Sequence, residues 1–116
     1  MARMSDSPMS ITVRFTQSGL HCWPEAPPHR AYLASLHRHL FFVEVTTPVE
    51  HAGRQIEFHD LLEDAKRLFE IRESDSCEMM AANLVRWLCN KYAGRPFRVS
   101  VFEDDECGAT VTGPHD

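Results

Sequence analysis

Apolar and polar residues alternate near the start of the chain. Ile11, Val13 and Phe15 are β-branched or aromatic and are separated by polar residues. A period of two residues is typical of a strand with one buried face, so the pattern predicts a strand over residues 10–17. A proline-rich connection follows. The next apolar run predicts a more deeply buried strand over residues 36–47.

The middle of the chain follows a helical period. After Pro48 and Gly53, apolar residues recur at i, i+4, i+7 and i+8, which places them on one face of a helix. That face consists of Leu61, Ala65, Leu68 and Phe69. We expect a second helix to begin near Asp75, whose side chain can cap the backbone, with Glu78 completing a capping box. Its expected buried stripe is Met80, Leu84, Trp87 and Leu88.

The last part of the chain returns to a strand pattern. Gly94 and Pro96 are stop signals for the second helix. The alternation over residues 97–102 predicts a strand that can pair with residues 109–111 across an acidic turn. The predicted order is β-β-α-α-β-β in a single α+β domain, with an antiparallel four-stranded sheet and two helices on one face. We expect its core to span about residues 10–112, with short disordered ends.

Composition narrows the possible functions. The formal net charge of −5 and the acidic run at residues 103–106 disfavour direct binding of nucleic acid. No stretch approaches the ~18 uninterrupted apolar residues of a membrane span, and the N-terminus lacks the apolar centre of a secretory signal. We therefore expect a cytoplasmic protein with no membrane partner. Its four widely spaced cysteines, without a Cys-x-x-Cys pair, are expected to be reduced thiols.

Seven histidines invite a search for a metal site. His37 and His39 are two residues apart on a predicted strand, so both side chains project from one face with Cα atoms roughly 6.5–7 Å apart. His21, at the end of the first strand, is the best-placed third donor, because an antiparallel neighbour can bring that end beside the start of the second strand. From the pattern alone, the alternative is a set of separate surface or core histidines.

Four segments, in this order, resemble the 6-pyruvoyltetrahydropterin synthase and 6-carboxytetrahydropterin synthase family. Leu-His-Arg-His-Leu-Phe at residues 36–41 resembles the family's Leu-His-Gly-His-aromatic segment. Residues 53–61 resemble the entry to its first helix, with Glu57 in place of aspartate, and residues 76–78 resemble its Thr-x-Glu motif. Residues 98–103 resemble the strand that ends in the family's substrate-anchoring glutamate.

The resemblance implies the tunnelling fold (T-fold) and a zinc ion held by His21, His37 and His39. It also implies that Glu103 binds the guanidine-like edge of a pterin or purine-like ligand, where a carboxylate can accept two parallel N–H bonds. Without the resemblance, Glu103 would be a solvated turn carboxylate. The family's rings of subunits imply a homo-oligomer, and its chemistry implies a pterin or a deazapurine such as a queuosine precursor.

Two catalytic parts of the family have no counterpart in this sequence. Leu33 stands where the family has a cysteine, four residues before the first histidine of the pair. The connection at residues 71–74 is too short for the family's Asp-His pair. Candidate replacements are His51, His59 and Cys107, each of which is otherwise explained as a surface or helix-start residue. Cys22 adjoins a proposed ligand, but neighbouring side chains on an extended chain diverge.

Two functions are consistent with these residues. The first is a zinc-dependent, lyase-like enzyme in which the metal polarises a carbonyl or hydroxyl and a protein base moves a proton. The second is a non-catalytic zinc-binding T-fold protein that binds a purine-like ligand or serves as an oligomeric scaffold. A structural zinc domain fits less well, because three clustered donors leave a coordination position open.

Overall fold

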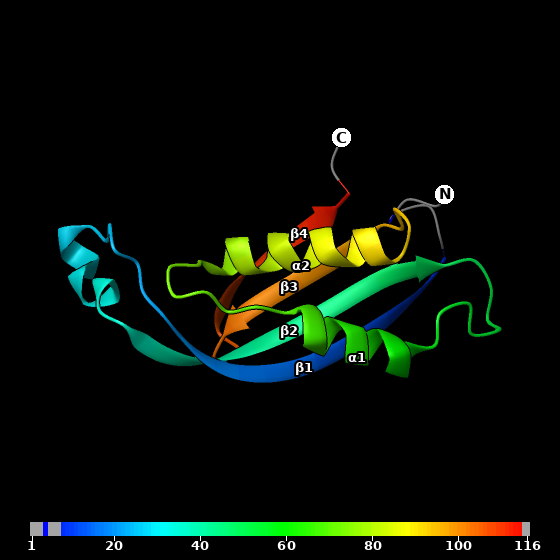
Figure 1. Ribbon diagram of the computed structural model, residues 1–116, viewed down its shortest axis with the longest axis horizontal. Coiled ribbons are helices and arrows are strands. Elements are labelled where there is room, and N and C mark those ends of the chain that lie inside the picture. The colour runs from blue at the N-terminus through cyan, green and yellow to red at the C-terminus, as the bar shows by residue number, and fades with distance from the viewer. Residues whose placement is uncertain (1–3, 5–7, 115–116) are drawn as a thin grey trace.

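Two long and two short strands form one antiparallel sheet in the computed structural model, which describes residues 4 and 8–114 (Figure 1). The long strands are β1 (Met9–His21) and β2 (His37–Val49), and the short strands are β3 (Phe97–Glu103) and β4 (Cys107–Gly113). The strand order is β1-β2-β3-β4. This architecture confirms the predicted antiparallel four-stranded sheet.

Helices α1 (Phe58–Leu68) and α2 (Cys77–Lys91) cover one side of the sheet, with α1 beside β1 and α2 along β3 and β4 (Figure 1). The order β-β-α-α-β-β is confirmed. Odd-numbered strand residues face the helices, as a period of two requires. The buried core between the two layers includes Val13, Phe15, Phe41, Val43, Val45, Leu61, Met80, Leu84, Leu88, Phe97, Val99 and Val101.

The start of α2 differs from the prediction. Ser76 is the N-cap in place of Asp75, and its hydroxyl accepts a hydrogen bond from the Met79 amide at 3.2 Å. Trp87 is also not part of the buried stripe, since 39% of it is exposed. At about 100° per residue, Trp87 lies on the flank of a stripe centred between Leu84 and Leu88. Ala81 and Val85 complete that stripe on its other side.

β1 extends four residues beyond the predicted end at residue 17, whereas β2 is close to its predicted range, and the two strands pair along their whole length, from Met9 opposite Val49 to His21 opposite His37. Polar residues end the apolar alternation of β1 early, but backbone pairing needs no apolar side chain. β3 pairs with β2 only as far as Phe41. The β1–β2 ribbon therefore continues past the rest of the sheet at its histidine end.

The connection at this end contains a 3₁₀ segment that the sequence pattern did not predict, η1 (Pro28–Ala34). It lies beyond α1, where β1 ends and β2 begins (Figure 1).

The expectation of disordered ends falls largely on residues 1–3, 5–7 and 115–116, outside the described part of the chain, although Gly113 belongs to β4. None of the helices that the structure describes has the length and apolar character needed to cross a membrane.

Candidate metal centre and pocket

The pairing of β1 with β2 brings three imidazoles together. His21 lies directly opposite His37, and His39 is two residues further along β2 on the same face. Ring centroids are separated by 4.6 Å for His21 and His37, 5.3 Å for His21 and His39, and 4.9 Å for His37 and His39. One ring nitrogen from each residue lies within 4.8 Å of the other two. The group could hold a metal ion.

Each of the three rings is oriented through its Nδ1 atom. Nδ1 of His21 lies 2.8 Å from the Asp75 carbonyl oxygen, and Nδ1 of His37 lies 2.8 Å from the Ser35 carbonyl oxygen. Nδ1 of His39 lies 2.7 Å from a carboxylate oxygen of Asp104. These oxygens accept hydrogen bonds, so Nδ1 is the protonated nitrogen and a neutral ring presents its lone pair at Nε2. Such fixed tautomers are typical of metal-binding histidines.

Two of these Nε2 atoms are buried with no hydrogen-bond partner among the described residues, those of His21 and His39. A buried polar atom that lost its water without gaining a partner costs about 1–3 kcal/mol. A cation between the rings would satisfy both lone pairs. The donor chemistry and the convergence of the rings therefore fit a metal ion.

The acidic turn between β3 and β4 supplies the support for His39. Asp104 and Asp105 have φ values of 52° and 60°, and the Glu106 amide donates to the Glu103 carbonyl at 2.9 Å. Positive φ at both central residues makes this a tight hairpin turn of type I′. The Leu40 amide donates to Asp104 Oδ1 at 2.9 Å, which ties the turn to β2.

The hydrogen bonds from His39 and Leu40 lower the pKa of Asp104, so its carboxylate stays ionised. Sequence reasoning treated Asp104 only as part of an acidic turn and missed its bond to His39.

The connection between α1 and α2 crosses the end of β1 and supports His21. The Cys22 amide donates to the Glu73 carbonyl at 2.7 Å, and Asp75 supplies the carbonyl that binds His21. Gly19 permits this close approach, since a methyl group there would lie 2.5 Å from Cδ1 of Ile71. The connection that is too short for an Asp-His pair thus contributes backbone oxygen instead.

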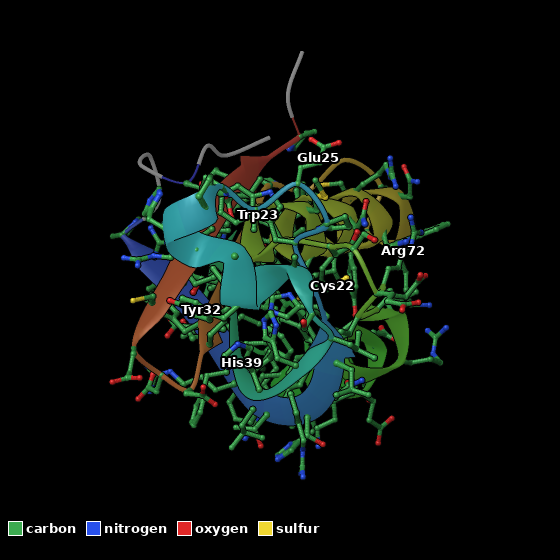
Figure 2. The ribbon with its side chains drawn as sticks, turned by 90° about the vertical axis from the view of Figure 1, so that its left-hand side faces the viewer. Cys22, Trp23, Glu25, Tyr32, His39 and Arg72 are labelled. Carbon is green, nitrogen blue, oxygen red and sulfur yellow. The ribbon has the colours of Figure 1, made fainter. Side chains whose placement is uncertain are left out.

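A pocket of about 410 Å³ opens beside the histidines. Its lining residues include His21, Cys22, Trp23, Leu33, His37, Asp75, Cys77, Glu78, Glu103, Cys107 and Gly108. Figure 2 looks onto this end of the molecule, with Cys22 and His39 toward the middle of the view and Glu25 and Arg72 at its rim. The volume suits a small-molecule ligand.

Glu103 connects the pocket with the histidines. Its Oε1 atom lies 3.2 Å from Nε2 of His21, and its Oε2 atom lies 3.5 Å from Nε2 of His39. The Cys77 thiol donates to Oε1 with a sulfur–oxygen distance of 3.9 Å. Burial and the nearby Glu103 charge raise the pKa of Cys77 to about 12, so this thiol stays protonated. Sequence reasoning missed Cys77, which follows the cap of α2 without a distinguishing motif.

Of the three candidate replacements for the family's catalytic groups, one lies at the pocket and two lie far from it. Cys107 lines the pocket opposite Glu103 in the β3–β4 pairing. His51 follows the far end of β2, where its Nδ1 accepts from the Gly53 amide, and His59 is paired with Glu57 on α1. Strands of 13 residues span about 40 Å. Within one chain, His51 and His59 are therefore not brought to the histidine cluster.

Comparison with models of known protein families finds no match for this chain. Comparison with curated protein sequences finds no match either. The function is therefore inferred from the residues of the pocket and their geometry.

Proposed function

We propose that this chain is a divergent, zinc-dependent T-fold protein of the 6-pyruvoyltetrahydropterin and 6-carboxytetrahydropterin synthase type that acts on a pterin or deazapurine-type ligand. One observation carries the proposal. Three imidazoles with hydrogen-bonded Nδ1 atoms converge through Nε2 at the wall of a pocket that also contains Glu103. That combination would provide a metal site and an acceptor for a polar ligand edge within one small cavity.

His21, His37 and His39 would hold the ion. Imidazole nitrogens suit zinc, and three protein ligands are typical of a site that also admits water or substrate. Ideal tetrahedral binding places ligand atoms about 3.4 Å apart, so the rings need only a small closure from their present separations of up to 4.8 Å. When bound, zinc would polarise a carbonyl or hydroxyl oxygen of the ligand.

Glu103 would orient that ligand. A carboxylate can accept two parallel N–H bonds from the guanidine-like edge of a pterin or deazapurine. The Cys77 thiol contacts Glu103 and Cys107 is the partner of Glu103 across β3 and β4, and Cys77 stays protonated and so does not attack a carbon as thiolate. A step that requires a Cys77 thiolate as nucleophile therefore does not fit this pocket.

A non-catalytic zinc-binding T-fold protein is the second candidate. Leu33 lines the pocket at the position of the family's cysteine, and no residue of the α1–α2 connection supplies an imidazole there. Such a protein would bind a purine-like ligand or act as an oligomeric scaffold. In both candidates we propose a homo-oligomer, which sedimentation velocity on the untagged chain would test.

The test combines metal analysis with ligand binding. Untagged protein should contain near one zinc per chain, and its melting temperature should rise with a pterin or a deazaguanine. Glu103→Gln should lose that rise, whereas Glu106→Gln, an exposed residue of the same turn, should keep it. Product formation from a reduced pterin would distinguish the enzyme from the binding protein. Protein without zinc would contradict the proposed function.

A further inference from the structure

Glu103 faces the buried Nε2 atoms of His21 and His39. The carboxylate oxygens lie 3.2 Å and 3.5 Å from Nε2 of His21 and His39, yet neither nitrogen has a hydrogen-bond partner among the described residues. Nδ1 carries the proton in each ring, so Nε2 presents a lone pair toward a negatively charged oxygen. A cation between the nitrogen and the oxygen, or a second proton on the ring, makes this contact favourable.

The separations match those between neighbouring ligands of one ion. With Zn–N of about 2.0–2.1 Å and Zn–O of about 2.0–2.2 Å, tetrahedral ligand atoms stand roughly 3.3–3.5 Å apart. The Glu103 contacts, 3.2 Å from Oε1 to Nε2 of His21 and 3.5 Å from Oε2 to Nε2 of His39, lie within about 0.1 Å of that range.

We propose that Glu103 is the fourth metal ligand in the ligand-free protein, completing a site of three histidines and one carboxylate. The inference rests on the metal site of the proposed function and adds a closed resting state to it. A ligand with a guanidine-like edge would take the carboxylate from the metal, which opens a coordination position only when the pocket is filled. Glu103 thereby couples ligand recognition to metal access.

The surroundings of Glu103 permit this exchange. Its backbone is fixed at the end of β3, opposite Phe41 on β2 and Cys107 on β4. Its side chain is 30% exposed and also lines the pocket, so the carboxylate can turn from the ion to a ligand without moving the strand. The Cys77 thiol donates to the same oxygen that faces His21, with a sulfur–oxygen distance of 3.9 Å.

Cobalt substitution tests the assignment without any assay of activity. Cobalt(II) reports its coordination through visible d–d absorption, and azide binds only where a coordination position is open. We expect the spectrum of the wild-type cobalt protein to be unchanged by azide. Glu103→Ala should bind cobalt at least about tenfold more weakly and should show a new spectrum on addition of azide.

Controls separate this inference from the proposed function. Glu106→Gln should behave as the wild type, and Glu103→Gln provides a second variant that keeps the side-chain volume. If wild type and Glu103→Ala bind cobalt equally and respond equally to azide, Glu103 is not a ligand, while the three-histidine site stands. If wild-type protein does not bind cobalt, the metal site itself is wrong, and both proposals fail.

Discussion

The middle and the histidine end of the β1–β2 pair place different side chains on the same face of the sheet. Along β2, one face presents Val45, Val43 and Phe41 beneath the helices and then His39 and His37 beyond them. The middle is covered by helices, whose backbone groups are already hydrogen-bonded internally. The end is covered by connections and a turn, which have oxygen atoms free to accept bonds from Nδ1. What covers the strand therefore decides whether a row of side chains becomes core or a metal site.

The largest expected effect is a loss of stability, without loss of metal binding, from a substitution in the core of the molecule. Leu84 is 1% exposed in the core, so Leu84→Ala should lower the free energy of unfolding by about 2–5 kcal/mol, since it leaves a cavity. Denaturant titration of metal-free protein measures the change. The folded variant should bind zinc as tightly as the wild type. A large loss of zinc affinity under folding conditions would show that the two regions are not independent.

A substitution at the histidine end of β2 should have the converse effect, a loss of zinc affinity with little change in stability. His37→Ala should weaken zinc binding by more than about 100-fold, roughly 2.7 kcal/mol, because it removes one of three ligands. Competition with a chromophoric chelator measures the affinity. In chelator-treated protein the free energy of unfolding should change little, since His37 is partly exposed. His29→Ala on the exposed η1 segment is the matched control. Unchanged zinc affinity in His37→Ala would contradict the metal site.

A smaller loss is expected when only the support of a ligand is removed. Asp104→Asn keeps the shape of the side chain but weakens the acceptor for Nδ1 of His39, so zinc affinity should fall about 10–100-fold. Asp105→Asn, the neighbouring exposed turn residue, should have no such effect. Equal affinities for both variants would show that the charge of the turn, rather than the bond to His39, favours the cation.

The same comparison explains how much could be predicted from the sequence. Periods of two and of about 3.6 residues predict the strands and helices of the middle, where burial selects apolar side chains. The histidine pair and antiparallel pairing also place His21, His37 and His39 together. The carbonyl oxygens of Ser35 and Asp75 leave no such pattern, because a backbone group carries no residue type. The exposed Trp87 shows a further limit, since hydrophobicity alone does not locate the centre of a helical stripe.

The smallest expected effect lies in the middle region and depends on pH. The Tyr92 hydroxyl donates to Asp64 Oδ2 at 2.6 Å and thereby joins α2 to α1. Burial alone would raise the pKa of Asp64, but the hydrogen bonds from Tyr92 and Arg67 outweigh it and lower that pKa. Tyr92→Phe should reduce the free energy of unfolding by about 1–2 kcal/mol at neutral pH.

A lowered pKa stabilises the folded state above the unfolded-state pKa of about 3.9, and that stabilisation is lost as the pH falls through the folded-state pKa. In Tyr92→Phe the pKa of Asp64 rises toward its ordinary value, so the difference between wild type and variant should be constant near neutral pH and should narrow below about pH 4. Urea titrations of metal-free protein across this range measure it. A difference that stays constant down to pH 2 would mean that the Tyr92 hydroxyl contributes in a way that does not depend on the ionised carboxylate of Asp64. Zinc affinity at neutral pH should be unchanged, because the pair lies in the helix-covered part of the sheet, away from the histidines.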